Sequence, residues 1–164
     1  MTTTFKRVLV ALSALVISLV AIVAATPAAS SATVPTNPAL TNIRTGLNNG
    51  FDRVVLDLTH GQPSVSYSNV DELIADGSGE VVWLTGEFFV SVVATPAGAH
   101  DDNGNRTYTG PEKFRTRNLR NVMAVALTGD FEGYLSVGLG IRYQSWVRVF
   151  TLTNPSRIVI DVGH

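Results

Sequence analysis

The sequence predicts an all-β fold, a small β-sandwich of two antiparallel sheets with at most one or two short helices. Short runs of β-branched, aliphatic and aromatic residues recur along the chain, and clusters of Gly, Asn, Asp and Pro separate them. No stretch of the folded part keeps a helical period. This spacing of short strands and turns is typical of sandwiches and barrels, and of the two we expect the sandwich.

The expected strands follow one another with turn residues between them. They cover residues 51–59, 64–70, 81–95, 122–127, 134–143, 146–153 and 157–162. Residues 71–76 and 111–119 are the only candidates for a short helix, since Pro111 is tolerated at a first helical position. The segment Asp76-Gly77-Ser78-Gly79 reads as a hairpin turn.

One pattern is written twice, in residues 53–58 and 157–162, each with an arginine and an aspartate around aliphatic residues. Alternation along a strand places Arg53, Val55 and Asp57 on one face. In the second copy, Arg157, Val159 and Asp161 share one face in the same way. Arg and Asp within one strand are roughly 13 Å apart, too far to pair. We therefore expect them to pair across antiparallel neighbours.

The N-terminus has the features of a secretory signal peptide. Lys6 and Arg7 precede an apolar stretch over residues 8–25, and small residues follow, so cleavage is expected after Ala32. An uncleaved anchor helix is the alternative, since 18 apolar residues just reach spanning length. We then expect a flexible spacer over residues 33–41 and a single secreted domain over residues 42–164, without a membrane segment once the signal peptide is cleaved.

Composition excludes several classes of function. Two of the 12 basic residues lie in the signal peptide, which leaves ten against 13 acidic ones, a net charge of −3. The arginines are scattered, so nucleic acid is not an expected partner. The chain has no cysteine, only three histidines at positions unsuited to a metal, and no Gly-x-Ser-x-Gly motif. We expect a monomer without cofactor, metal or catalytic residues.

The candidate ligand-binding residues lie in polar loops and at strand ends. Residues 129–134 place two acids and two aromatic rings between glycines: Phe131 either plugs the end of the sandwich or forms a pocket rim with Tyr134. Trp146 either packs in the core or, exposed on one face with Arg148, provides a stacking platform for a sugar or a partner. Other aromatic residues, Phe51, Trp83, Phe88 and Phe150, are expected in the core. The full candidate set is Tyr108, Asp130, Phe131, Glu132, Tyr134 and Trp146.

The polar loop over residues 101–112 has two interpretations. Asp101, Asn103, Asn105 and Glu112 fall at positions 1, 3, 5 and 12 of a calcium loop, but Arg106 occupies the position that needs glycine. An Asn-Gly hairpin turn explains the same residues more simply.

Residues 154–162 resemble the closing signature of AMIN domains, in which a Pro-x-Arg step leads into an aliphatic strand that ends in Asp and an aliphatic residue. With residues 50–56, 99–110 and 129–133, the chain is similar to the AMIN-like domains of secreted actinobacterial proteins over most of residues 42–164. The resemblance implies a β-sandwich of two small sheets that serves as an envelope-targeting or cell-wall-binding module. No amidase domain is expected in this chain.

The residues and the resemblance together predict a secreted, non-catalytic module that binds peptidoglycan or an associated cell-wall glycan. The alternative is a module that docks an envelope protein and thereby localises or regulates a wall enzyme. A small extracellular hydrolase is a third possibility, which the missing catalytic residues disfavour.

Overall fold

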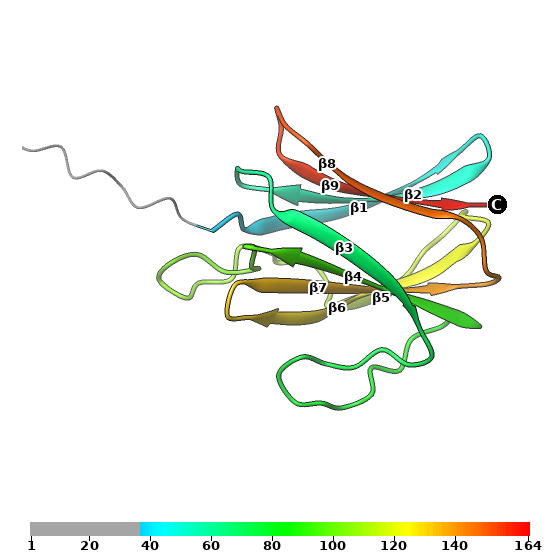
Figure 1. The fold of residues 1–164 in the computed structure, drawn as a ribbon, viewed down its shortest axis with the longest axis horizontal. Coiled ribbons are helices and arrows are strands. Elements are labelled where there is room, and N and C mark those ends of the chain that lie inside the picture. Colours follow the sequence, from blue (N-terminus) through cyan, green and yellow to red (C-terminus); the bar gives the residue numbers. More distant parts are fainter. Residues whose placement is uncertain (1–36) are drawn as a thin grey trace, which may run out of the picture. The chain divides into compact units, whose positions relative to one another are not determined.

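The computed structural model describes residues 37–164, and these form a β-sandwich of two antiparallel sheets, as the sequence predicts (Figure 1). The predicted signal peptide and most of the predicted spacer lie outside the described residues. The strands are β1 (Leu40–Asn48), β2 (Phe51–Leu58), β3 (Ser64–Val70), β4 (Phe88–Thr95), β5 (Lys113–Arg115), β6 (Val122–Phe131), β7 (Tyr134–Ile141), β8 (Val147–Leu152) and β9 (Arg157–Gly163). Within residues 37–164, no helix is long and apolar enough to cross a membrane.

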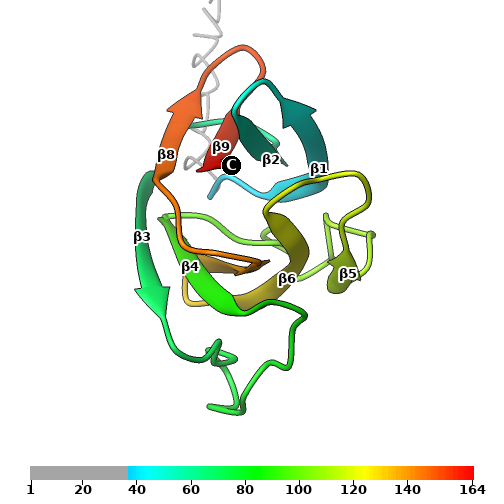
Figure 2. The same cartoon turned by 90° about the vertical axis from the view of Figure 1, so that its right-hand side faces the viewer.

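The two sheets stack face to face with the core between them (Figure 2). One sheet has four strands in the order β1-β2-β9-β8, and the other has five in the order β3-β4-β7-β6-β5. Aliphatic residues at alternate positions of each strand fill the space between the sheets, as the period of two requires. The most deeply buried of them include Val54, Leu56, Ile158 and Ile160 from the first sheet and Val90, Val137 and Leu139 from the second.

The two copies of the repeated pattern, β2 and β9, are direct neighbours, and they pair as expected at one position. Arg53 lies opposite Asp161, and its Nε and Nη2 donate to the two carboxylate oxygens at 2.6 and 2.9 Å. At the other position Asp57 lies opposite Arg157 but accepts two hydrogen bonds from Arg44 of β1. The prediction of pairs across antiparallel neighbours is therefore confirmed for Arg53 with Asp161 and for Asp57 with Arg44 of β1, but not for Arg157, which donates to the carbonyl of Pro155.

Asp161 should make the stability of the protein depend on pH. Burial by itself would raise the pKa of this carboxyl, but hydrogen bonds and charges from Arg53 and Arg148 outweigh burial and hold the pKa below the ordinary 3.8. Folding therefore favours the ionised form, and the resulting stabilisation is complete above the unfolded pKa and lost as the pH falls through the folded one. We expect Asp161→Asn to cost about 1–3 kcal/mol at pH 7, a difference that shrinks below about pH 4.

Asp57→Asn is the matched control, because Asp57 also holds a bidentate arginine on the same sheet but is partly exposed. Exposed ion pairs contribute about 1 kcal/mol or less. Urea unfolding of both variants and the wild type between pH 7 and pH 3 measures the effect. Parallel stability curves for the wild type and Asp161→Asn over this range would contradict the assignment.

Several sequence-based boundaries differ from the structure. The first strand begins at Leu40, inside the expected spacer, because Ala39 and Leu40 are buried and the Leu40 amide donates to the carbonyl of Gly98. The candidate helix at residues 111–119 does not form, since β5 pairs there with β6. Residues 71–76 are not helical either, and the strand expected from residue 81 begins only at Phe88.

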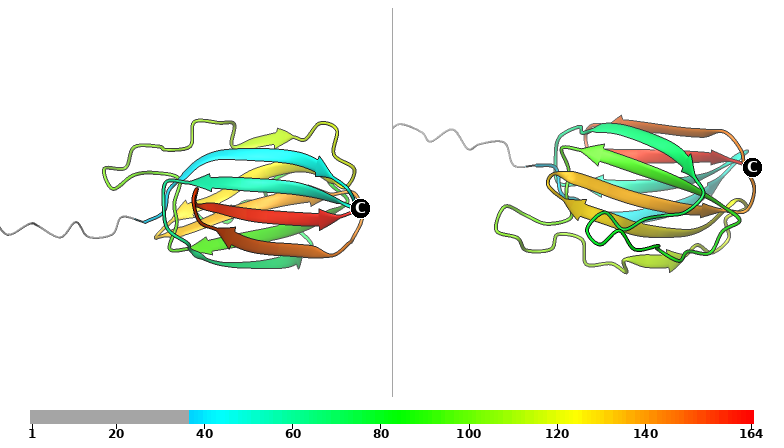
Figure 3. Two further views of the ribbon diagram at one scale, coloured as in Figure 1. Left: turned by 90° about the horizontal axis from the view of Figure 1, so that it is seen from above. Right: turned by 60° about the horizontal axis from the view of Figure 1, so that its bottom comes forward.

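The segment over residues 71–87, between β3 and β4, lies on the outer face of the five-stranded sheet, and we call it the covering segment. It is the long loop below this sheet in Figure 1 and crosses it in the right panel of Figure 3. Three glycines of β6 and β7 allow the close approach: a Cβ on Gly129 would overlap Asp76, one on Gly138 would overlap Leu73, and one on Gly140 would overlap Thr85. This segment carries the turn predicted at residues 76–79, closed by the bridge between Ile74 and Val81.

Two of the aromatic residues expected in the core are exposed. Trp83 is 80% exposed in the covering segment, and Phe88 is 40% exposed at the first residue of β4. Phe51 and Phe150 are partly buried, on the outer face of the four-stranded sheet. Aliphatic side chains fill most of the space between the sheets instead.

Candidate functional site

The β6–β7 hairpin turn brings two exposed aromatic rings together. Glu132 and Gly133 form a two-residue turn, both with positive φ (49° and 79°), which is the geometry that matches the twist of a tight hairpin. Phe131 and Tyr134 are therefore directly paired across the hairpin, and they are 59% and 51% exposed. The turn lies at the opposite end of the sandwich from the C-terminus (Figure 1).

Two carboxylates line the concavities that these rings border, Asp76 beside both rings and Asp130 beside Phe131. Asp76, from the covering segment, accepts a hydrogen bond of 2.5 Å from Ser136 of β7. Asp130, at the end of β6, accepts from the Ala99 amide at 2.8 Å and contacts His100 Nδ1 at 2.8 Å. We call this group of Asp76, His100, Asp130, Phe131, Glu132, Tyr134 and Ser136 the β6–β7 corner.

Two concavities meet at the corner. One, of about 330 Å³, is lined by Asp76, Phe131, Glu132, Tyr134 and Ser136, together with Val93 of β4. The other, of about 660 Å³, lies along Asp130 and His100 and extends to Arg106 and Glu112. Phe131 borders both. Volumes of this order suit one or a few sugar-sized units.

Four of the six predicted residues meet at this corner, namely Asp130, Phe131, Glu132 and Tyr134. Tyr108 does not: it is only 3% exposed, packs in the core and donates its hydroxyl hydrogen bond to the carbonyl of Pro111. Burial raises the pKa of its phenol. Trp146 is exposed and not packed in the core, but it lies at the other end of the sandwich beside Phe51.

Three residues of the corner, Asp76, His100 and Ser136, were not among the sequence-based candidates. Asp76 is 60 positions from Ser136 in the chain, and His100 is 30 from Asp130. No local pattern connects such distant positions. Gly129 is the one residue in the sequence that relates to this contact, because a side chain at position 129 would overlap Asp76. Its role can be recognised only once the position of the covering segment is known.

The loop over residues 101–112 forms a turn that its own side chains hold. Asp101 accepts hydrogen bonds from the amides of Asn103 and Asn105 and from the Asn105 side chain, and the Asn105 bonds contribute most to lowering the pKa of Asp101. Glu112 pairs with Arg106 at 2.7 Å. In residues 37–164 no three His, Cys, Asp or Glu side chains come together as metal ligands. The turn interpretation accounts for these contacts.

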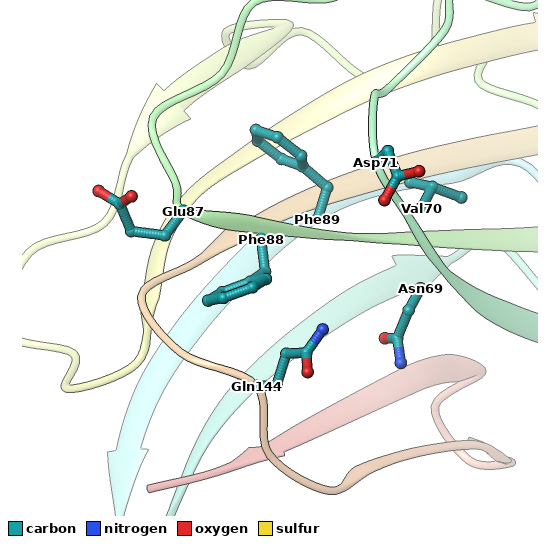
Figure 4. Close-up of a pocket in the computed structure, with 7 residues that line it drawn as sticks. All are labelled: Asn69, Val70, Asp71, Glu87, Phe88, Phe89 and Gln144. Atoms are coloured by element: carbon teal, nitrogen blue, oxygen red, sulfur yellow. The ribbon is translucent and has the colours of Figure 1, made fainter.

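A further concavity, of about 250 Å³, lies at the opposite end of the sandwich around the start of β4 (Figure 4). Its polar lining consists of Asn69, Asp71, Glu87 and Gln144. Figure 4 shows Phe88 and Gln144 on one side of β4 and Phe89 on the other. The lining side chains therefore do not converge on a single ligand position, unlike those of the β6–β7 corner.

Comparison with known proteins identifies a family. The model of the family described as AMIN-like domain matches residues 38–164, which include every strand from β1 to β9. Searches of curated proteins and of solved structures returned no match.

Proposed function

The chain belongs to the AMIN-like domain family, and we propose that it is a secreted, non-catalytic module that binds peptidoglycan or an associated cell-wall glycan at the β6–β7 corner. One observation carries this proposal: two exposed rings, Phe131 and Tyr134, border a concavity that carboxylates also line. A sugar offers C–H faces that stack on aromatic rings and hydroxyls that donate to carboxylates. Secretion rests on the signal sequence before residue 33.

The partners of the carboxylates support binding rather than hydrolysis. A glycosidase needs two carboxyl groups that face one glycosidic bond, one as acid and one as base or nucleophile. Asp130 is instead held by the Ala99 amide and by His100, and Asp76 is held by Ser136. These hydrogen bonds fix the acceptors in place, which favours recognition of hydroxyl groups.

The double substitution Phe131→Ala, Tyr134→Ala should weaken binding to purified cell-wall sacculi at least about fivefold, because each stacked ring contributes about 0.5–1.5 kcal/mol. Both rings are more than half exposed, so the thermal midpoint should change little. Cosedimentation with sacculi at moderate salt measures binding, and thermal unfolding checks the fold.

Tyr143→Ala is the matched control, since Tyr143 is also an exposed tyrosine, 41% exposed, but lies after β7 at the other end of the sandwich. It should bind sacculi like the wild type. Absence of wild-type pelleting would reject wall binding altogether. Equal pelleting of the wild type and the double variant would reject the corner as its site.

Docking of an envelope protein is the second candidate function, and Trp83 is the observation that favours it. This ring is 80% exposed beside the short edge strand β5, where Lys113 donates to the Trp83 carbonyl at 3.4 Å and Arg115 to Thr85 at 3.1 Å. Exposed tryptophans beside cationic side chains are frequent in protein interfaces. If this function holds, the wild type and the corner variant should retain a protein partner from solubilised cell envelope without pelleting with sacculi, and Trp83→Ala should lose that partner.

A further inference from the structure

The outer face of the four-stranded sheet carries an ordered group of arginines and aromatic rings, far from the β6–β7 corner. Figure 3 (left) shows this sheet from above, with β8, β9 and β2 side by side and no segment of residues 37–164 lying across them. Register places Arg53, Asp161 and Arg148 in one row across the three strands. We call Phe51, Arg53, Trp146, Arg148 and Phe150, grouped around Asp161, the arginine–aromatic face.

Both guanidinium groups of this face are held in fixed positions. Arg53 binds Asp161 through two nitrogens, and Arg148 Nη2 donates to the same carboxylate at 2.7 Å. The ring centroid of Phe150 lies 6.0 Å from Cζ of Arg53 and 5.2 Å from Cζ of Arg148. The ring centroid of Phe51 lies 5.1 Å from Cζ of Arg53. Ordered guanidinium groups lose little side-chain entropy when they bind a ligand.

The row has more positive than negative charge. Asp161 is fully buried and carries one charge against two arginines, and the Arg148 side chain is 60% exposed. Farther along β9, Arg157 donates to the carbonyl of Pro155. The chain after residue 32 has a net charge of −3, so this excess of positive charge is local to the face. Charge complementarity therefore indicates an anionic ligand.

The hydrogen-bond donors that remain suit a phosphate group. Asp161 occupies the Nε and Nη2 edge of Arg53, and it takes one Nη2 bond from Arg148. The remaining N–H groups belong to two separate guanidinium groups, so an anion that bridges them needs diverging oxygens. A tetrahedral phosphate has such oxygens, whereas a planar carboxylate is better matched to a single bidentate edge.

The aromatic part of the face suits the units between phosphates. Trp146 is 52% exposed and packs against Phe51 with ring centroids 6.1 Å apart. An exposed ring of this kind provides a stacking platform for a sugar or polyol unit. The face is an open sheet surface, which accommodates an extended chain.

We propose that the arginine–aromatic face binds a phosphodiester-linked polymer of polyols or sugars, an anionic component of the cell envelope. The polymer lies across β2, β9 and β8, with one phosphate bridging Arg148 and Arg53 and the adjoining polyol or sugar unit on Trp146. This site is separate from the β6–β7 corner; only the source of the polymer, the cell envelope, rests on the secretion and wall association proposed above. A wall-binding protein with both sites would bind neutral and anionic wall polymers at once, which increases its avidity.

Titration of the purified protein with soluble poly(glycerol phosphate) at several salt concentrations tests this proposal. Arg148→Gln should weaken binding at least about fivefold and lower the slope of log affinity against log salt by about one, because one phosphate contact is lost. Arg148→Lys should leave the salt dependence unchanged, because the charge remains. Trp146→Ala should weaken binding but leave the slope of log affinity against log salt unchanged. Circular dichroism confirms that each variant is folded.

Arg106→Gln is a closely matched control. Arg106 is also 60% exposed and also donates through Nη2 to a carboxylate at 2.7 Å, but it lies outside the face. It should bind poly(glycerol phosphate) like the wild type. The proposed site would be wrong if Arg106→Gln and Arg148→Gln lost equal affinity for poly(glycerol phosphate), or if Arg148→Gln lost none. Equally tight binding of polygalacturonate, whose anions are carboxylates, would overturn the phosphodiester assignment.

The corner and the face can fail independently. The Phe131→Ala, Tyr134→Ala variant should bind poly(glycerol phosphate) like the wild type if the face acts alone. Arg148→Gln should bind sacculi like the wild type once phosphodiester polymers have been stripped from them by acid. A loss in both assays from either variant would mean that the two surfaces are not separate sites, and would overturn the proposal.

Discussion

Substitution of Asp52 by alanine is expected to lower the free energy of unfolding by about 3–5 kcal/mol. Asp52 is fully buried, and its carboxylate accepts hydrogen bonds from the amides of Arg120, Asn121 and Val122 at 3.2, 2.6 and 2.8 Å. It thereby joins β2 of one sheet to the start of β6 in the other. Alanine leaves these donors unpaired, and each buried unpaired amide costs about 1–3 kcal/mol.

Urea unfolding followed by tryptophan fluorescence measures this loss, with an unchanged m-value expected if the transition stays two-state. Asp52→Asn should lose less, because the amide oxygen can still accept the two hydrogen bonds from Asn121 and Val122 that Oδ2 of the carboxylate accepts. Asp71→Ala is the control: Asp71 is exposed, so its removal should change stability by about 0.5 kcal/mol or less. A loss below about 1 kcal/mol in Asp52→Ala would show that water replaces the carboxylate at these amides.

The alternation of β2 explains why part of this arrangement can be predicted from the sequence. Val54, Leu56 and Leu58 define the core face, and alternation puts Asp52 on the same face. The three amides that bind Asp52 come from positions 120–122, and nothing in the pattern near residue 52 indicates them. Periodicity therefore predicts which way a side chain points, while its distant hydrogen-bond partners need the folded structure.

The same limit applies to the candidate site. The acids and aromatic residues of the β6–β7 turn can be identified locally, because Glu132 and Gly133 form a tight turn that presents Phe131 and Tyr134. Tyr108 has similar polar neighbours in the sequence, yet it packs in the core. Whether a loop aromatic residue faces the solvent or the core depends on how the loop folds back, and loop sequences carry no periodic signal for that.

Tyr108 is predicted at the surface but is buried, whereas Trp83 is predicted in the core but is exposed. Large aromatic side chains are usually buried, so Trp83 is expected in the core, but the segment that carries it lies on the outer face of a sheet. Interior space is already filled by Val, Leu and Ile from both sheets. The glycines that allow this segment to approach the sheet are spread over β6 and β7. From the sequence alone, a glycine within a strand indicates only a locally weaker strand.

Substitution of Gly140 by valine should destabilise the protein by about 3 kcal/mol, at the upper end of the usual range for overpacking. Gly140 lies on the outer face of β7, and even a Cβ at this position would overlap the carbonyl oxygen of Thr85. The backbone fixes the position of the Cβ, and the carbonyl oxygen is itself a backbone atom, so no side-chain rotation relieves the clash. Residues 71–87 must move away from the sheet, which exposes Leu73 and weakens the whole covering layer.

Gly46→Val is the matched control, since Gly46 also lies in a strand but has no atom within 4 Å of a Cβ at its position. Valine is well tolerated in strands, so urea unfolding should show a change within about 1 kcal/mol. Equal stability of Gly140→Val and Gly46→Val would contradict close packing of the segment.

Asp76 belongs to the same segment and reaches the corner through Ser136. Gly140→Val should therefore also weaken sacculus binding, because displacement of the segment removes one carboxylate from the site.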